Sequence, residues 1–228
     1  MTRAGWVRII PFALFMGFIG IEQGIGWLLE RGSLDLPAPS LLYLYPLKAL
    51  LVAAMLGWFW RDYVEISLAD FKQVVFTGGS VLLGLLVFVL WIHMDWDFAT
   101  FGQSSGFNPY LLEDDSQRLV IIASRLFGAV LVVPVMEELF WRSFLLRYTI
   151  NADFMKVRVG TYSLGSLLIC AVLFGLEHHL VLAGIMAGLA YSGLLYWTRS
   201  IAQCILAHAV TNLALGIYVL YTGAWQFW

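Results

Sequence analysis

VVPVMEELFWRSFLLR, residues 132–147, places Glu137, Glu138 and Arg142 inside an otherwise apolar run. A charged side chain in the hydrocarbon of a membrane costs about 2.5–3.5 kcal/mol. Either a structural ion pair or a site that carries out chemistry has to offset that cost. The segment therefore raises two questions: whether its surroundings are a membrane, and what its charges do there.

The composition of the chain favours a membrane protein. Of its 228 residues, 61% are hydrophobic and only 12% are charged. Soluble domains have about 25% charged residues. Half that charge density, together with apolar runs about 20 residues long, is typical of a polytopic helical membrane protein. A net charge of −2 gives no reason to expect nucleic acid as a partner.

Hydropathy predicts an all-α transmembrane helical bundle of about seven spans. The spans lie at residues 8–29, 41–60, 74–93, 120–147, 161–178, 180–198 and 201–222. We expect a single integral-membrane domain over residues 1–228, with the motif-bearing core at residues 118–222. Cys170 and Cys204 lie in apolar surroundings and are interpreted as small hydrophobic residues.

Lysine and arginine residues near the span ends predict the orientation. They flank the cytoplasmic ends of the predicted spans, whereas residues 94–117 contain five acidic residues and no Lys or Arg. We therefore expect a cytoplasmic N-terminus. In that orientation His178 falls at the outer end of a full-length fifth span, far in depth from Glu137. If the two residues belong to one site, either the fifth helix starts outside the membrane or residues 177–179 form a break buried inside the bundle. We favour the buried break, because irregular backbone at membrane depth is tolerated where protein or a water-filled cavity surrounds it.

The three charges of the fourth span have different geometries. Glu138 and Arg142 are four residues apart, so they share a helix face and can pair. Glu137 is rotated by about 100° from Glu138 and is predicted to point away from that pair. A buried ion pair thus explains two of the three charges. Pro134 lacks a backbone donor and is predicted to kink the helix beside the glutamates.

Two further polar segments interrupt the apolar spans. LFGLEHHLVLAG, residues 173–184, holds Glu177, His178 and His179, for which a short solvated outer loop is an alternative interpretation. ILAHAVTNLALG, residues 205–216, holds His208 and Asn212, which lie four apart on one helix face.

With the fourth span, these segments supply a carboxylate, two imidazoles and an amide. That set suffices for hydrolysis by direct attack of water, with a proton acceptor for the water and donors for the oxyanion.

The motifs also carry a resemblance. EELFWR fits Glu-Glu-x-x-x-Arg, FGLEH fits Phe-x-x-x-His and HAVTN fits His-x-x-x-Asn, in that order. Over about residues 130–215 the chain resembles the CAAX-protease and bacteriocin-processing (CPBP, Abi) family of intramembrane glutamic proteases. Ser143 stands where the family usually has Gly. With the terminal GAWQFW, the motif segments also resemble the bacterial CAAX-protease-related subgroup that accompanies exosortase (PEP-CTERM) systems.

The resemblance implies a helical bundle with a catalytic cavity inside the membrane. Glu137 would be the catalytic glutamate that activates water together with His178, and His208 and Asn212 would form the oxyanion hole. Neither a metal nor another cofactor is implied.

Three further motif residues receive supporting roles from the resemblance. Glu138 and Arg142 would shape the site, and Phe174 would orient the segment that bears His178. The implied protein is a multi-pass endopeptidase of the bacterial inner (cytoplasmic) membrane, acting in the lipid bilayer on a membrane-associated peptide or protein, with a functional link to an exosortase system.

Other functions fit parts of the pattern. A metallopeptidase with Glu137, His178 and His208 as ligands is one, although no His-Glu-x-x-His motif is present. A transporter would explain intramembrane Glu and His, but the sequence has no visible repeat. A non-catalytic membrane scaffold or immunity protein on the same fold is the third.

Overall fold

The computed structural model describes residues 2–100 and 106–228, and within these ranges it is helical and contains no strand. The α-helices are α1 (Arg3–Glu30), α2 (Leu44–Trp58), α3 (Val74–Ile92), α4 (Asp115–Phe127), α5 (Val133–Glu138), α6 (Leu146–Tyr148), α7 (Leu164–Leu176), α8 (Val181–Thr198) and α9 (Ile201–Thr222). Two π-helical segments, Gly128–Val132 and Leu139–Leu145, join α4, α5 and α6 into one long helix.

The predicted membrane bundle is confirmed, with one change. In the described part of the chain, six helices are long and apolar enough to cross a membrane. The fifth predicted span, 161–178, is instead the 13-residue helix α7. At 1.5 Å per residue α7 rises about 20 Å, which is less than the roughly 30 Å of a hydrocarbon core. α7 is therefore too short to cross a hydrocarbon core by itself, and it ends two residues before His178.

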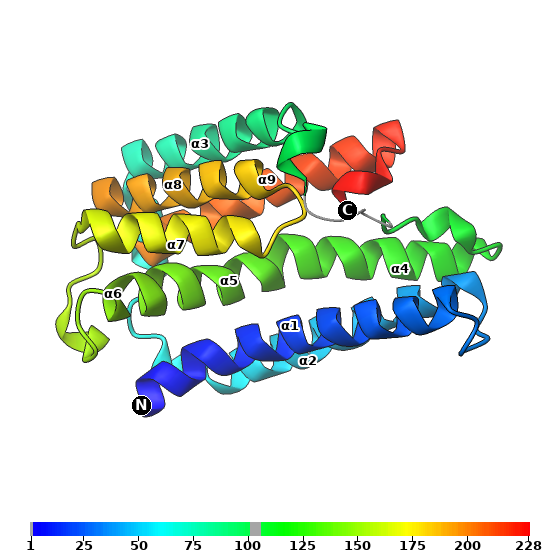
Figure 1. The fold of residues 1–228 in the computed structure, drawn as a ribbon. Coiled ribbons are helices and arrows are strands. Elements are labelled where there is room, and N and C mark those ends of the chain that lie inside the picture. Colours follow the sequence, from blue (N-terminus) through cyan, green and yellow to red (C-terminus); the bar gives the residue numbers. More distant parts are fainter. Residues whose placement is uncertain (1, 101–105) are drawn as a thin grey trace.

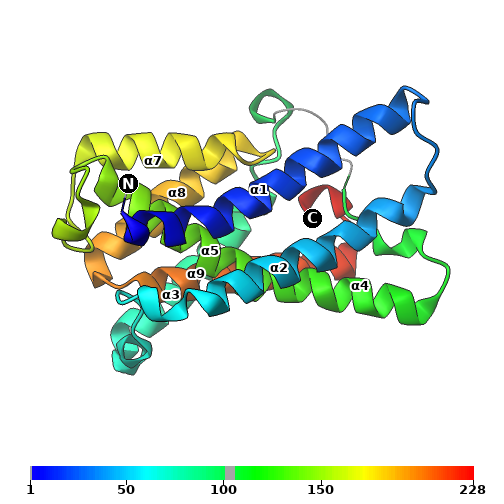
Figure 2. The ribbon, with the colours of Figure 1, turned by 90° about the horizontal axis from the view of Figure 1, so that it is seen from below.

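The long helix of residues 115–148 crosses the middle of the bundle. Figure 1 shows α1 and α2 on one side of it, with α7, α8, α9 and α3 on the other. Figure 2, turned by 90°, shows α1 and α2 in front of α5. Asp114 caps its start, since Oδ1 accepts a hydrogen bond from the Gln117 backbone N–H at 2.7 Å. The two glutamates of α5 thus sit at the centre of the molecule.

Small residues let α7 and α8 pack closely. A Cβ on Gly184 of α8 would lie 2.8 Å from Cα of Gly175 on α7, and one on Gly188 would lie 3.0 Å from Cα of Ala171. Such close backbone contact is a common basis for helix association in membranes. The short turn between the two helices is thereby held against the core, where it carries the second motif.

A buried ionic network fixes the other end of the central helix. Arg8 of α1 donates to the Glu65 carboxylate at 2.6 and 2.8 Å and to the Ser143 hydroxyl at 3.0 Å. The Ser143 hydroxyl also hydrogen-bonds to Glu65 and accepts from Arg147 Nη2 at 2.9 Å. Ser143, the residue after Arg142, therefore joins α1 and the connection between α2 and α3 to the central helix.

Candidate active site

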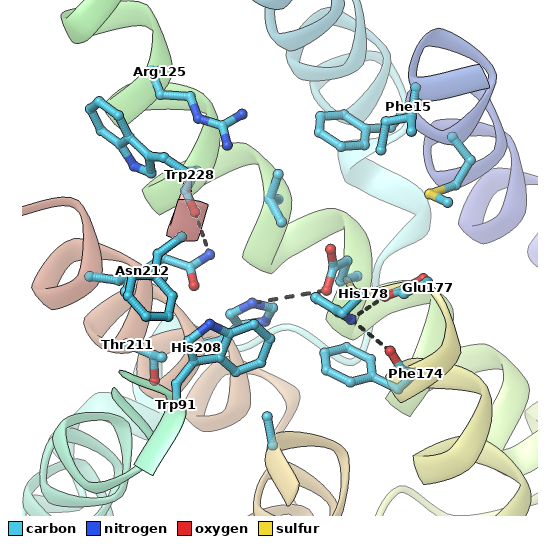
Figure 3. A pocket seen from close by; sticks show the side chains of 18 of the residues that line it. Phe15, Trp91, Arg125, Phe174, Glu177, His178, His208, Thr211, Asn212 and Trp228 are labelled. Atoms are coloured by element: carbon cyan, nitrogen blue, oxygen red, sulfur yellow. Dashed lines mark hydrogen bonds and ion pairs between the residues drawn. The ribbon is translucent and has the colours of Figure 1, made fainter. Parts of the chain in front are cut away.

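One pocket brings together the predicted catalytic residues. Its cavity volume is about 260 Å³, which is room for several water molecules or a short length of peptide. Glu137, His178, His208 and Asn212 all line it. They come from the central helix, from the turn after α7 and from α9, and Figure 3 shows the two histidines facing the same space.

Glu138 and Arg142 form the predicted ion pair. Arg142 Nη1 donates to Glu138 Oε1 at 3.2 Å, and both side chains are buried. The same carboxylate oxygen accepts from Nδ1 of His208 at 3.0 Å. The Arg142 guanidinium lies 4.5 Å from the centroid of the Phe174 ring and 5.3 Å from that of Tyr191. Glu138 therefore holds both a guanidinium and an imidazole, in a cluster packed by aromatic rings.

Glu137 is not part of the Glu138–Arg142 ion pair, but its carboxylate lies close to the same imidazole. Its Oε2 lies 3.9 Å from Nε2 of His208, whose Nδ1 bonds to Glu138. Two adjacent glutamates can reach opposite edges of one imidazole, because a 100° rotation places their carboxylates on either side of the ring. Glu137 is 7% exposed, and its Oε2 has no hydrogen-bond partner in the described part of the chain. That oxygen is a buried acceptor with unmet hydrogen-bonding capacity, on a residue that lines the pocket.

His178 lies in the turn between α7 and α8, at the pocket wall. Its Nδ1 lies 2.7 Å from the carbonyl oxygen of Phe174, one helical turn earlier. A carbonyl oxygen only accepts, so Nδ1 carries the hydrogen, and in the neutral ring Nε2 is left as an acceptor. The Phe174 ring also packs against the imidazole, with centroids 4.8 Å apart. Phe174 thus orients His178 through both its backbone and its ring.

Glu177 belongs to the same cavity, so the interpretation of this turn as a solvated outer loop is wrong for Glu177 and His178. The Glu177 side chain is 10% exposed, and its Oε1 accepts from Nε1 of Trp141 at 3.1 Å. Glu137, Glu177 and His178 each offer a potential metal-ligand atom, and these atoms lie within 4.8 Å of one another. The metallopeptidase alternative predicted Glu137, His178 and His208 as ligands, whereas the group in the structure contains Glu177 and not His208.

Asn212 contacts the central helix where Pro134 interrupts the hydrogen bonding. In the π-helical turn the Val133 N–H donates to the carbonyl of Gly128, five residues earlier. The next bond in that register needs an N–H at Pro134 for the carbonyl of Ala129, and proline has none. Nδ2 of Asn212 donates to the Ala129 carbonyl at 2.7 Å instead. The predicted proline distortion is therefore a π-helical turn, closed by a side chain from α9.

Residues 117–214 match a family model. It is the Rce1-like family, described as type II CAAX prenyl endopeptidase Rce1-like. The matched region is somewhat less than half of the chain and contains all three motifs. The match supports the CPBP family and points to a CAAX-type intramembrane protease. Comparisons with curated proteins and with solved structures gave no match.

Several residues of the Rce1-like region shape the site although no motif singles them out. The Tyr191 ring stacks on His208 with centroids 5.0 Å apart, and its hydroxyl donates to Thr211. Trp141 holds Glu177 as described above. Outside the matched region, Trp91 packs on His178 at 5.3 Å. A tyrosine or tryptophan in an apolar helix carries no signal of a site, because most such residues are ordinary packing.

Proposed function

We propose that this chain is an intramembrane glutamic endopeptidase that hydrolyses a peptide bond by direct attack of water. One observation carries the proposal: Glu137, His178, His208 and Asn212, from separate parts of the bundle, line one cavity of about 260 Å³. The match of residues 117–214 to a family of CAAX prenyl endopeptidases supports the peptidase class.

Glu137 and His178 are the residues that activate the water. Glu137 and His178 both line the pocket and each offers an acceptor atom, and these atoms lie within 4.8 Å of each other, so one water molecule can donate a hydrogen bond to each. Glu137 takes the proton as the water oxygen bonds to the peptide carbon. The same proton then passes to the leaving amine when the carbon–nitrogen bond breaks, which returns Glu137 to the carboxylate.

His208 and Asn212 stabilise the oxyanion that forms between these steps. As an imidazolium, His208 donates to Glu138 from Nδ1 and to the oxyanion from Nε2. Asn212 uses one N–H for the Ala129 carbonyl and has a second for the substrate. Glu138 and Arg142 hold His208 in place, and Phe174 holds His178.

The setting proposed for this activity is the bacterial inner membrane, with a cytoplasmic N-terminus. The substrate is a membrane-associated peptide or protein that reaches the cavity from the bilayer. The likeness of the motif segments and of GAWQFW to the exosortase-associated subgroup supports a functional link to an exosortase system.

Cleavage of a peptide library by purified protein tests the proposal. Quenched fluorescent peptides of apolar sequence are offered to the wild type in detergent, beside Glu137→Gln and His178→Ala. The matched control is Glu113→Gln, an exposed glutamate remote from the cavity lining. We expect cleavage by the wild type and the control, and a loss of at least about 100-fold in the other two. Equal cleavage by Glu137→Gln and the wild type would refute the proposal, and a scaffold protein would cleave nothing in any form.

A metal-dependent peptidase is the second candidate, favoured by the Glu137, Glu177 and His178 group. Two carboxylates and an imidazole can bind a divalent cation, and a water on that cation would replace the Glu137-activated water. Metal-binding histidines usually bind the metal through one ring nitrogen and donate a hydrogen bond from the other. His178 already donates from Nδ1 to the Phe174 carbonyl, which leaves Nε2 for a metal. Chelation distinguishes the two candidates, as set out in the Discussion.

A further inference from the structure

Arg125 lines the same pocket as Glu137 but has no part in the hydrolysis proposed above. Its Cζ lies 4.3 Å from the ring centroid of Tyr45, 4.9 Å from that of Phe107 and 5.9 Å from that of Trp228. The electron-rich faces of these rings attract a guanidinium and hold it in one place. They supply no negative charge, and the five N–H donors of a guanidinium exceed what its contact with the Tyr45 hydroxyl can use.

Arg125 also has no carboxylate partner in the described part of the chain, unlike the other cations around the cavity. Lys48 pairs with Glu22 at 2.8 Å, and Arg142 pairs with Glu138. Within residues 2–100 and 106–228, no acidic oxygen lies within 4.0 Å of the Arg125 guanidinium. Its Nε is buried without a hydrogen-bond partner. A charge held in this way inside a membrane protein favours binding of an anion.

The charges give the pocket two unlike ends. Figure 3 shows Arg125 and Trp228 across the pocket from Glu177 and His178. Near Arg125, the two cations Arg125 and Lys48 have one acidic side chain beside them, Glu22. At the other end, the three carboxylates of Glu137, Glu138 and Glu177 lie beside the Arg142 guanidinium and the His208 imidazole. A carboxylate in the cavity is therefore attracted to the Arg125 end, where cations outnumber acidic side chains.

We propose that Arg125 binds a carboxylate of the peptide substrate and thereby sets where the peptide is cut. This inference rests on the proposed function. A planar guanidinium binds a carboxylate through two parallel hydrogen bonds, which fixes position as well as charge.

The helix gives the spacing between this carboxylate and the bond that is cut. Arg125 and Glu137 are twelve residues apart on the central helix, a rise of about 18 Å. An extended peptide advances about 3.3–3.6 Å per residue. The carboxylate therefore lies roughly four to six residues from the scissile bond. Both a C-terminal carboxylate and an acidic side chain meet this requirement.

Three peptide libraries test the assignment. All consist of the same eight-residue apolar sequences: one has a free C-terminal carboxylate, one a C-terminal carboxamide, and one a carboxamide with a single Glu among its last three residues. Binding to Glu137→Gln protein in detergent is measured by titration, and cleavage is measured with the wild type. Arg125→Gln and Arg125→Lys are compared in both backgrounds. The control is Arg118→Gln, because Arg118 is on the same helix, pairs with Asp115 at 2.6 Å and lies outside the pocket.

We expect at least one anionic library to bind about tenfold or more tighter than the neutral library, the size of one charge-assisted hydrogen bond. The anionic library that binds more tightly shows whether the carboxylate is the C-terminus or an acidic side chain. The preference should vanish in Arg125→Gln, persist in part in Arg125→Lys and be unchanged in Arg118→Gln. Equal binding of all three libraries, or a preference that survives Arg125→Gln, would overturn the assignment.

The two readouts separate this inference from the proposed function. An Arg125-dependent binding preference without any cleavage would keep the anion site and refute the peptidase. Glu137-dependent cleavage without a preference among the libraries would keep the peptidase and refute the anion site.

Discussion

The side-chain amide of Asn212 donates to the carbonyl of Ala129, which Pro134 leaves without a backbone donor. Two segments that are far apart in the sequence are thus joined by one hydrogen bond, about two turns before the glutamates of α5. This bond ties α9, which carries His208, to the helix that carries Glu137. Glu137 and Asn212, which belong to different motifs, therefore lie on helices that this hydrogen bond joins. Pro134, which makes the bond possible, belongs to no motif.

The connection predicts coupling between Pro134→Ala and Asn212→Ala. Asn212→Ala leaves the Ala129 carbonyl without a donor, which costs about 1–3 kcal/mol for a buried group. Pro134→Ala restores a backbone N–H, so Asn212→Ala should cost at least about 1 kcal/mol less in that background. The free energies of unfolding of the four proteins form a double-mutant cycle. Strictly additive effects would show that Asn212 does not act through the carbonyl.

Glu137 and Glu138 should respond differently to the same substitution. Glu138→Gln removes the charge that compensates Arg142 in a buried site, and we expect a loss of about 3–5 kcal/mol in unfolding free energy. Glu137→Gln breaks no ion pair with a lysine or arginine, and we expect little change in stability but a fall in cleavage rate of about 10²–10⁴-fold. Thermal unfolding and cleavage are measured on both. Similar stability losses in the two variants would show that the glutamates are equivalent after all.

Chelators should leave the activity unchanged. Glu137 and His178 already provide two acceptors for the attacking water, so the proposed chemistry needs no metal. The measurement is cleavage after dialysis against a strong chelator, together with elemental analysis of the purified protein. Loss of cleavage on chelation, with recovery on adding Zn²⁺, would establish the Glu137, Glu177 and His178 group as a metal site. The control is Arg118→Gln, which should change neither the cleavage rate after chelation nor the metal content.

Glu65 should make the stability of the protein depend on acid pH. Burial opposes ionisation of this carboxyl, but hydrogen bonds and charge from Arg8, with the Ser143 hydroxyl, outweigh it and lower its pKa below the ordinary value. A lowered pKa stabilises the fold above the unfolded pKa of about 4.3, and the contribution is lost as the pH falls through the folded pKa.

The difference in stability between the wild type and Glu65→Gln isolates this contribution. It should be constant between about pH 5 and 7 and should shrink below about pH 4. Denaturation in detergent at a series of pH values measures it, with the exposed Glu113→Gln as a reference. A difference that stays constant down to about pH 3 would show that the Arg8 pair does not hold the Glu65 charge.

Much of the fold follows from the sequence because its signals are local. Long apolar runs predicted six of the helices to within several residues, since a membrane span needs about 20 apolar residues. The spacing of four between Glu138 and Arg142 predicted their ion pair, which the structure confirms. The fifth span was predicted too long because hydropathy does not register where the backbone of α7 begins and ends, at Leu164 and Leu176.

The remaining parts of the site depend on contacts between distant segments. α-Helical geometry separated Glu137 from the ion pair, but it could not predict that His208 of α9 lies close to both glutamates. The part played by Trp141 in holding Glu177 depends on how the α7–α8 turn folds back on the central helix. Neither relationship has a signature in local spacing.

Cleavage in ¹⁸O-labelled water tests the central claim, direct attack by a water activated at Glu137, most directly. Excess wild-type enzyme is mixed with a cleaved peptide in the presence of chelator, and the products of a single turnover are analysed by mass spectrometry. The account predicts one ¹⁸O atom in every new C-terminal carboxylate and no peptide attached to the protein. A covalent peptide adduct, or an unlabelled carboxylate after the first turnover, would contradict it.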